Sequence, residues 1–333
     1  MRYLITGGAG FIGSNFIRLL LEKEPNSKII NFDKLTYAAN LDNLRDIEKN
    51  KNYKFVKGDI CNKKIVEKLI KKTDIVVHFA AETHVDRSII EAGEFIKSDI
   101  YGTFVLLNMA RKSKIERFMH ISTDEVYGSV QEGSFTEEST LRPTNPYSAS
   151  KAGADRLAFS YFKTFKLPVI IVRSSNNFGP YQHPEKLMPL FTTNAIENKK
   201  LYLYGDGLNK RDWLYVLDNC EAIYFLMKKG GVGEVYNVGA DNERTNLDIT
   251  KMILKELKKP NLLIKFVKDR VSHDRRYALN FSKIRKGGWR PKYKFEKALK
   301  ETINWYVDNE WWWKKIKQRK KFKEYYKKQY GKR

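Results

Sequence analysis

Cysteine is scarce in this chain, with two copies among 333 residues. Cys61 and Cys220 lie far apart and form no Cys-x-x-Cys pair or Cys/His cluster. This scarcity argues against a disulfide framework and against a structural metal site, because both need several such residues at suitable spacing. We therefore expect a reducing compartment and no bound metal.

Long apolar runs are also missing. No stretch approaches the roughly 18 apolar residues that a membrane-spanning helix requires. The first residues, MRYLITGGAGF, reach glycines after a short apolar run, which is not the pattern of a signal peptide. The sequence thus predicts a soluble, cytoplasmic protein that does not bind a membrane.

Acidic residues are few relative to basic ones: 39 Asp and Glu against 63 Lys and Arg give a formal net charge of +24. Much of the excess lies in a basic tail, 314–333, in which aromatic residues alternate with lysines. Such a segment could bind nucleic acid, but no recognised nucleic-acid-binding module accompanies it. We favour a terminal helix whose aromatic rings pack on the body while its lysines face water. The remaining positive charge would attract an anionic substrate.

Short apolar runs alternate with helical patterns along the first 150 residues, which is typical of βαβ units and a parallel sheet. Strands are expected at 2–6, 28–32, 53–59, 74–80, 117–122 and 167–173, with helices between them, notably 12–22, 92–112 and 146–164. The prediction is an α/β fold: a Rossmann-type doubly wound parallel sheet with a smaller C-terminal α/β lobe. We place the cofactor domain at 1–175, the substrate lobe at 176–313, with elements that could return to the sheet, and the basic tail at 314–333.

The stretch TGGAGFIG (6–13) contains Gly8-x-Gly10-x-x-Gly13 and also Gly7-x-x-Gly10-x-x-Gly13. It follows a predicted strand and opens a predicted helix, which is the context that a dinucleotide site requires. Glycine lets the backbone approach a pyrophosphate at the helix N-terminus. Asp33 ends the next strand, where its carboxylate would bind ribose hydroxyls and repel a 2′-phosphate. The cofactor predicted is NAD.

Two further motifs carry chemistry. Tyr147 and Lys151 are four residues apart in NPYSASK (145–151), on one face of a helix that begins near Pro146. A nearby ammonium and a cationic nicotinamide would favour the phenolate, so Tyr147 is a candidate base. Upstream, STDEVYG (122–128) places Asp124 beside Glu125 at the end of a strand. A surface pair of charges is the alternative reading of that doublet.

Together these motifs resemble the extended short-chain dehydrogenase/reductase family along nearly the whole chain. Within it, nucleotide-sugar epimerases usually have small residues between the Ser/Thr and the Tyr of this motif, where this chain has Asp124 and Glu125. The stretch Thr123-Asp124-Glu125 is similar to that of the dTDP-glucose 4,6-dehydratases. Other segments agree with this resemblance: DKLTYA (33–38), HFAAETHVDRS (78–88), RSSNNFGPYQHPEKLMP (173–189), RDWLYV (211–216) and HDRRYA (273–278).

The resemblance implies a hydro-lyase that converts dTDP-glucose to its 4-keto-6-deoxy product, in rhamnose-type deoxysugar biosynthesis. Tyr147 would take the C4 hydroxyl proton, Glu125 the C5 proton, and a protonated Asp124 would protonate the departing O6. Two carboxylates in unlike environments can divide such roles. The NAD would stay tightly bound and be regenerated in each turnover, and a homodimer joined by 92–112 and 146–164 is expected.

The binding residues are also implied by the resemblance. For NAD they are Gly7, Gly10, Phe11, Ile12, Gly13, Asp33, Lys34, Leu35, Thr36, Asp59, Ile60, Ala80, Ala81, Thr83, Ser98, Tyr147, Lys151 and Asn177. For the sugar nucleotide they are Thr83, Thr123, Asn176, Lys186, Leu187, Arg211, Asn246, Arg270 and His273. The cations among them suit a diphosphate. His84, His120 and His183 are not spaced like metal ligands.

One loop departs from the family pattern. The chain has Asp269-Arg270-Val271-Ser272-His273 where the family has D-R-P-G-H. Loss of Pro and Gly changes the backbone preferences of the loop, so the nucleotide base, thymine or uracil, stays open. The alternatives are a UDP-sugar 4,6-dehydratase, an epimerase or decarboxylase of the same fold, and a catalytically silent NAD-binding scaffold.

Overall fold

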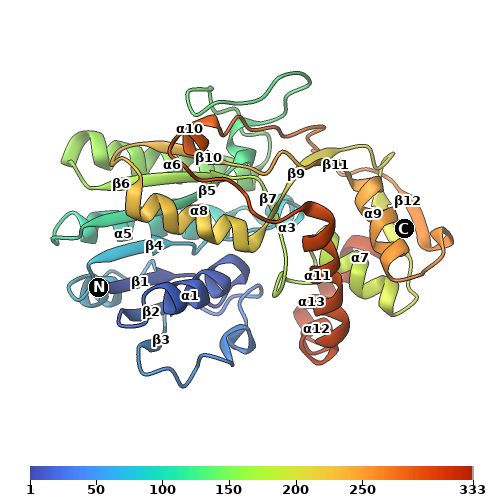
Figure 1. The fold of residues 1–333 in the computed structure, drawn as a ribbon, viewed down its shortest axis with the longest axis horizontal. Coiled ribbons are helices and arrows are strands. Elements are labelled where there is room, and N and C mark those ends of the chain that lie inside the picture. Colours follow the sequence, from blue (N-terminus) through green and yellow to red (C-terminus); the bar gives the residue numbers. More distant parts are fainter. Residues whose placement is uncertain (332–333) are drawn as a thin grey trace.

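A parallel sheet of seven strands forms the centre of the computed structural model, which describes residues 1–331 (Figure 1). The strands follow the order β10-β6-β5-β4-β1-β2-β3. Their bounds are β1 (Arg2–Thr6), β2 (Lys28–Asp33), β3 (Tyr53–Lys57), β4 (Ile75–His78), β5 (Arg117–Thr123), β6 (Val169–Ser174) and β10 (Val235–Val238). The predicted Rossmann-type sheet is confirmed, and β10 joins it from a segment beyond residue 176.

Each strand of this sheet contributes to two separate cores. In β1, Tyr3 and Ile5 pack into one hydrophobic cluster, whereas Leu4 packs into the other. In β5, Met119 and Phe118 divide in the same way. Successive side chains of a strand point to opposite faces, so a parallel sheet that is covered on both faces needs apolar residues throughout. This requirement explains the continuous apolar runs in the sequence.

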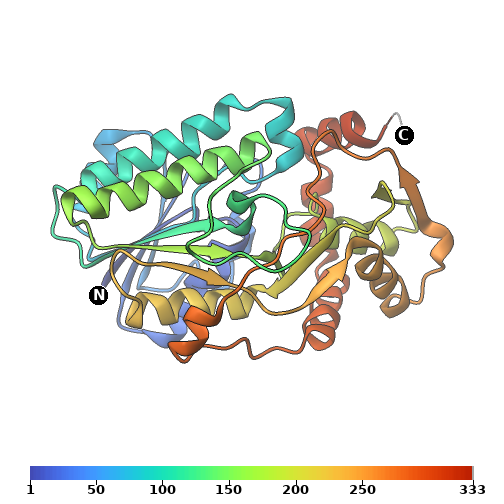
Figure 2. The same cartoon turned by 90° about the horizontal axis from the view of Figure 1, so that it is seen from above.

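Helices cover the sheet in two layers, which Figure 2 shows on either side of the strands. One layer contains α1 (Phe11–Lys23) and α8 (Val216–Lys229), and the other contains α2 (Lys63–Ile70), α5 (Thr103–Ala110) and α6 (Pro146–Phe165). Helix α6 begins with a capping box between Asn145 and Ser148 and has Pro146 at its first position. The cap therefore fixes where the Tyr147–Lys151 turn starts.

Two expectations about helices need correction. The helix predicted at 92–112 is composed of α4 (Gly93–Phe95), a π-helical stretch η2 (Ile96–Gly102) and α5. A helix between β2 and β3 is wrong, because that segment has only the short 3₁₀ helix η1 (Leu41–Leu44). The side chain of Asn43 donates to Ala9 O at 2.9 Å. Tertiary contacts, and not the hydrogen bonds of a regular helix, therefore fix this segment.

The smaller lobe lies at the carboxyl ends of the central strands. Its sheets are β11-β9-β7 and the parallel pair β12-β8. The elements are β7 (Asn176–Phe178), α7 (Leu187–Ile196), β8 (Leu201–Tyr204), β9 (Lys210–Tyr215), β11 (Glu243–Thr245), α9 (Asn246–Glu256), η4 (Asn261–Leu263) and β12 (Ile264–Val267). Two short helices pack on the large domain instead: α3 (Val85–Ile90) contacts α6, and α10 (Ser282–Lys286) contacts β10. A further 3₁₀ turn, η3 (Asp124–Tyr127), follows β5 directly.

The C-terminal region consists of α11 (Phe295–Asp308), α12 (Glu310–Lys317) and α13 (Lys320–Tyr330), drawn in red in Figure 1. The prediction of one terminal helix is wrong, because Arg319 has an extended backbone (φ −60°, ψ 137°) and separates α12 from α13. Its packing is confirmed for Trp312, Trp313 and Phe322, which are buried, whereas Trp311 is exposed. Residues 332–333 of the predicted tail lie outside the described residues. Within residues 1–331, every helix is too short or too polar to cross a bilayer.

Candidate active site

Two adjoining cavities open at the carboxyl ends of the central strands. The larger one, of about 280 Å³, is lined by the glycine turn, by the ends of β2, β4 and β5, and by Tyr147 and Lys151. The smaller one, of about 150 Å³, is lined mainly by the smaller lobe. The residues that line both are Glu125, Asn176, Asn177, Gln182 and Lys186. The cavities therefore meet at the predicted base.

The glycine turn forms one wall of the larger cavity. Gly7 has φ +71°, and a Cβ there would lie 2.6 Å from the backbone N of Ala80. A Cβ on Gly13 would lie 2.5 Å from Gly7 O, so neither glycine can be replaced without moving the backbone. Gly10 is the N-cap of α1 and contributes no side chain to its first turn. The N-terminus of α1 therefore offers free backbone N–H groups to a phosphate.

Asp33 lines this cavity beside the glycine turn. Its carboxylate accepts hydrogen bonds from the N–H groups of Ala9 (3.0 Å) and Leu35 (2.7 Å), which hold it at the end of β2. The buried oxygens Asn177 Oδ1 and Gln182 Oε1 have no protein partner among the described residues. Buried polar groups normally have partners. The glycine turn, the fixed carboxylate and these open acceptors fit a bound NAD.

Nearly all residues predicted to bind the cofactor line the larger cavity. They are Gly7, Gly10, Phe11, Ile12, Gly13, Asp33, Lys34, Thr36, Asp59, Ile60, Ala80, Ala81, Thr83, Ser98, Tyr147, Lys151 and Asn177. Leu35 is the exception: it has φ +60° and contacts Asp33 through its backbone N–H. Glu82 also lines this cavity, and no sequence motif had singled it out.

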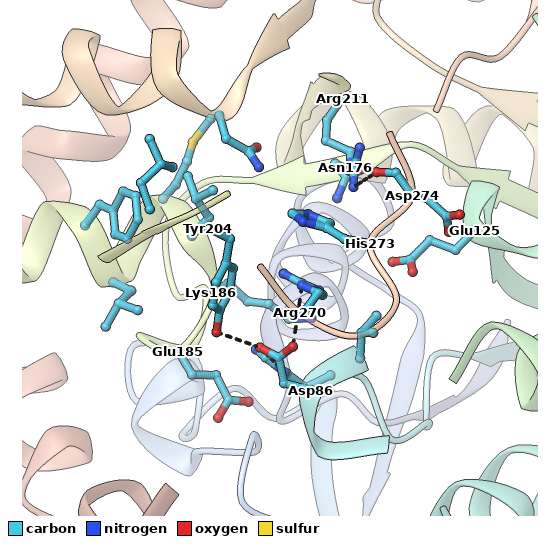
Figure 3. A pocket seen from close by; sticks show the side chains of 18 of the residues that line it. Asp86, Glu125, Asn176, Glu185, Lys186, Tyr204, Arg211, Arg270, His273 and Asp274 are labelled. Carbon is cyan, nitrogen blue, oxygen red and sulfur yellow. Dashed lines mark hydrogen bonds and ion pairs between the residues drawn. The ribbon is translucent and has the colours of Figure 1, made fainter. Parts of the chain in front are cut away.

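The smaller cavity gathers the predicted sugar-nucleotide residues. Those that line it are Asn176, Lys186, Leu187, Arg211, Asn246, Arg270 and His273. Thr83 and Thr123 line the larger cavity instead. In Figure 3, Glu125 and Lys186 lie on opposite sides of the smaller cavity, with Arg270 and His273 between them in that view.

Three cations in this cavity are held by the protein. Lys186 Nζ donates to the carbonyl oxygen of Thr83, Arg211 Nη2 donates to Asp274 O at 2.8 Å, and Arg270 Nε lies 3.6 Å from Asp86 Oδ1. The burial of Lys186 lowers its pKa, and the carboxylate of Glu125 acts in the opposite direction. Fixed cations whose charge is incompletely balanced bind a diphosphate well.

Sequence reasoning missed an aromatic wall of the smaller cavity. Tyr202, Tyr204 and Tyr330 all line it. The rings of Tyr202 and Tyr330 stack with centroids 5.5 Å apart, and Arg270 lies over the Tyr204 ring at 5.0 Å. Tyr330 comes from α13, far along the chain from β8. No local pattern could have brought these residues together.

The acidic pair lies where β5 ends and η3 begins. Thr123 caps this turn: its Oγ1 accepts from the Glu125 N–H at 3.3 Å and donates to Asp124 Oδ1 at 3.1 Å. Burial, followed by the neighbouring Glu125 charge, raises the pKa of Asp124 to about 8. Burial also raises the pKa of Glu125, but Lys186, Arg211 and Arg270 act against this shift. One carboxyl is thus kept protonated near neutrality, while its neighbour faces three cations.

Tyr147 and Lys151 lie on the first turns of α6, beside the larger cavity. Lys151 is buried, and its Nζ donates to Ile121 O at 2.7 Å. Burial and the charges of Glu125 and Asp99 raise the pKa of Tyr147 well above 10, whereas a hydrogen bond with Thr123 acts in the opposite direction. The protein's own groups thus hold Tyr147 protonated, and the predicted phenolate depends on the positive charge of the nicotinamide as well as on Lys151.

The remaining candidate groups, Tyr127 and three histidines, are packed in the protein interior. Tyr127, inside the acidic motif, is buried, and its hydroxyl donates to Asn237 Oδ1 at 2.8 Å. His84, His120 and His183 are buried among packed residues. Across residues 1–331 there is no group of three or more His, Cys, Asp or Glu placed to hold a metal ion.

Comparison with known proteins places this site in a family. A family model described as GDP-mannose 4,6 dehydratase matches residues 4–302. A dTDP-glucose 4,6-dehydratase of Streptomyces niveus is 47% identical over 322 residues, with 95% of this chain and 96% of the relative covered.

Two solved structures carry the same activity in their descriptions. One is a dTDP-glucose 4,6-dehydratase from Bacillus anthracis in complex with NAD, with 50% identity, a TM-score of 0.89, and coverage of 95% of this chain and 99% of the other. The second, from Streptomyces venezuelae with NAD and TYD bound, has 45% identity, a TM-score of 0.93, and coverage of 95% and 100%. The chain therefore belongs to the nucleotide-sugar 4,6-dehydratases and, within them, to the dTDP-glucose 4,6-dehydratase family.

Proposed function

We propose that the protein is an NAD-dependent hydro-lyase that converts dTDP-glucose to dTDP-4-keto-6-deoxyglucose. The observation that carries this proposal is the acidic pair. Asp124 and Glu125 stand where a cofactor cavity meets a cation-lined cavity, and their surroundings differ: burial and the Glu125 charge raise the pKa of Asp124 to about 8, whereas three cations act against the rise at Glu125. An epimerase has no step that needs two carboxyl groups at this position, whereas loss of water across two carbons needs an acid and a base.

The first step is removal of hydrogen from C4 of the sugar. When bound in the larger cavity, NAD supplies the acceptor and later the donor of a hydride. Tyr147 takes the hydroxyl proton, and Thr123, whose hydrogen bond lowers the pKa of Tyr147, orients the sugar O4. Lys151 adds a fixed positive charge, which supports the phenolate as the proton moves.

The second step is loss of water across C5 and C6. A ketone at C4 makes the C5 proton acidic, and Glu125 is the base that removes it. Lys186, Arg211 and Arg270 favour its ionised form. Asp124, protonated below about pH 8, gives its proton to the departing O6. With a proton back at C5, and with the hydride that bound NAD would return to C6, the 4-keto-6-deoxy product would form with no net change in the cofactor.

The direct test is to incubate the purified protein separately with dTDP-glucose and with UDP-glucose. The expected product from dTDP-glucose is the 4-keto-6-deoxy sugar, with no net release of reduced cofactor and with solvent deuterium at C5 in D₂O. NMR and mass spectrometry distinguish this product. Formation of a C4 epimer alone would contradict the proposal, and equal turnover of both substrates would contradict specificity for dTDP.

We also propose that the protein is a homodimer joined through the α4–η2–α5 segment and α6. Ile96 and Tyr101 expose 57% and 42% of their surface on η2, and Phe165 exposes 47% at the end of α6. Large apolar side chains exposed along these neighbouring helices suit a subunit interface. Light scattering should give twice the chain mass, and Tyr101→Glu should give the monomer. A monomeric wild-type protein would exclude the dimer.

The wider setting of the enzyme is a proposal as well. We place it in the cytoplasm, in rhamnose-type deoxysugar biosynthesis, with residues 1–175 as the cofactor domain, 176–313 as the substrate lobe and 314–333 as the basic tail. Its partner is a small nucleotide sugar rather than nucleic acid or a membrane, since the aromatic rings of the tail are largely used in packing. Retention on immobilised nucleic acid at physiological salt would contradict this view.

A further inference from the structure

A buried aspartate lies next to the catalytic helix and has no part in the reaction described above. Asp99 is 1% exposed and belongs to η2, the π-helical stretch between α4 and α5. Short π-helical segments inside α-helices occur frequently at functional sites. A buried carboxylate is costly unless hydrogen bonds and a cation compensate for lost hydration. Its partners therefore show what it does.

The two oxygens of Asp99 join the catalytic helix to the cofactor cavity. Oδ2 accepts a hydrogen bond from Ser150 Oγ at 2.6 Å, and Oδ1 accepts one from the backbone N–H of Glu82 at 2.8 Å. Ser150 directly precedes Lys151, and its hydroxyl also lies 2.8 Å from Tyr147 O. Glu82 lines the cofactor cavity between Ala81 and Thr83. One side chain thus fixes α6 relative to the loop that follows β4.

The cation that compensates Asp99 is the catalytic lysine. Burial raises the pKa of Asp99 to about 6, against the charge of Lys151 and the two hydrogen bonds. Burial lowers the pKa of Lys151, and the charges of Asp99 and Asp155 act in the opposite direction. Arg173 and Arg156 already pair with Asp155. Asp99 is therefore the carboxylate whose loss would affect Lys151 most.

We propose that Asp99 is a positioning residue for the reaction: its buried carboxylate holds Ser150 and the Glu82 loop in place and keeps Lys151 in the ammonium form beside Tyr147. The inference rests on the proposed function, because it assigns a supporting group to the same hydride-transfer step. Asp99 acts through Lys151 and Tyr147 and is not itself placed to contact the substrate.

Several titratable groups face this network. They are Tyr147, Lys151 and Asp155 on α6, Glu82 after β4, His78 on β4, His120 on β5, and Asp124 and Glu125 in η3. The negative charge of Asp99 raises the pKa of both Lys151 and Tyr147. C4 oxidation needs Tyr147 without its proton, which sets the acid limb of the pH profile, and Lys151 with its proton, which sets the alkaline limb. Removing the Asp99 charge alone should lower both pKa values and therefore move both limbs to lower pH.

The test uses Asp99→Asn in the NAD-loaded enzyme. Asparagine keeps the size and an acceptor for the Glu82 N–H but removes the charge. C4 oxidation is isolated in a Glu125→Gln background and followed by the absorbance of reduced nicotinamide in single turnovers. We expect both limbs to shift to lower pH by about one unit. Ser150→Ala removes a hydrogen bond but keeps the charge, so it should slow the step without moving the alkaline limb.

A matched control is Asp218→Asn in the same background. Asp218 is also buried and accepts two backbone N–H groups, from Lys292 and Tyr293, but it lies on α8 on the other face of the sheet. It should leave the pH profile unchanged. A profile of Asp99→Asn that matches this control would overturn the proposal. Absence of 4-keto-6-deoxy product from the wild-type enzyme would instead overturn the proposed function.

A measurement without substitution keeps the proposal testable if Asp99→Asn does not fold. In the wild-type holoenzyme with ¹³C-labelled aspartate and lysine, the Asp99 carboxyl signal should titrate near pH 6. The Lys151 Cε signal should shift with the same midpoint. Independent titration of the two groups would show that Asp99 does not control the lysine.

Discussion

The two cavities that meet at Glu125 are built in opposite ways. Among residues 1–331, only those between Gly7 and Lys186 line the cofactor cavity. Much of its shape comes from backbone: glycines without room for a Cβ and N–H groups at the N-terminal end of α1. The sugar cavity draws on residues from His84 to Tyr330, and its character comes from charged and aromatic side chains. One cavity therefore depends on the local geometry of the chain, and the other depends on segments that only the folded structure brings together.

The largest effect is expected at the junction between the two cavities. Tyr147→Phe removes the base for the C4 hydroxyl, so turnover should fall by about a thousandfold, with the cofactor left oxidised. NAD affinity, measured by calorimetry, should change little. Tyr161→Phe, a buried tyrosine further along α6, is the control and should stay active. Full activity of Tyr147→Phe would exclude the mechanism.

Glu125→Gln should block only elimination. The base for C5 is lost but the oxidising step stays possible, so turnover should fall by on the order of a hundredfold. Enzyme-bound reduced nicotinamide should accumulate after addition of dTDP-glucose, visible by its absorbance. Glu137→Gln, a residue that bonds the Asn237 N–H away from both cavities, should not accumulate it. Loss of both C4 oxidation and elimination in Glu125→Gln would contradict the assignment of Glu125 to elimination alone.

Arg270→Ala tests whether the two cavities bind independently. A lost charged contact to a diphosphate costs about 1.5–3 kcal/mol, so KM for dTDP-glucose should rise by about 10- to 100-fold with NAD affinity unchanged. Arg275→Ala, in the same loop but paired with Asp206 on the surface, is the matched control. Asp33→Asn should give the converse result, weaker NAD and unchanged KM. A change in both affinities in either variant would show that the two cavities do not bind their ligands independently.

The pH dependence of turnover should report Asp124. A pKa raised to about 8 means that this carboxyl carries its proton below pH 8 and loses it above. An acid must be protonated to act, so turnover should fall by up to about tenfold per unit as pH rises beyond 8. Asp124→Asn should retain low turnover, and this turnover should not fall as pH rises beyond 8. Turnover that stays constant from pH 7 to 9 would exclude Asp124 as the acid.

The smallest effect is expected at the aromatic wall. Tyr330→Ala removes a ring that stacks on Tyr202, which is worth about 0.5–1.5 kcal/mol and predicts a rise in KM of about three- to tenfold. NAD affinity should not change, because Tyr330 lines only the sugar cavity. Tyr330→Phe keeps the ring and should retain most of the affinity. A change in NAD affinity alone in Tyr330→Ala would contradict the assignment of Tyr330 to the sugar cavity.

The same contrast explains how much the sequence could predict. The apolar runs of β1 and β5 and the glycine turn at Gly7 are local patterns with direct physical causes, and the structure contains them where they were expected. The π-helical turns around Asp99 give no periodic signal. The contact of Tyr330 with Tyr202 joins segments that are distant in the chain, so it follows only from the packed fold.

The basic tail lies between these two cases. Its aromatic residues predicted packing, and Phe322 and Tyr325 are buried as expected. The break at Arg319 was not predicted, because neither proline nor glycine marks it. Lys317 also departs from the expectation of solvated lysines: its Nζ pairs with Glu197 at 2.6 Å, and only 12% of its side chain is exposed.

The position of α13 has a practical consequence for anyone who handles this protein. Tyr330 stands three residues before the end of the chain and forms part of the sugar cavity. A bulky label or linker attached to α13 would stand beside the binding site and compete with the substrate for space. Met1 is 46% exposed and precedes β1, so it lies at the amino ends of the strands, whereas the cavities open at their carboxyl ends. Tags, labels and immobilisation chemistry belong at the amino terminus.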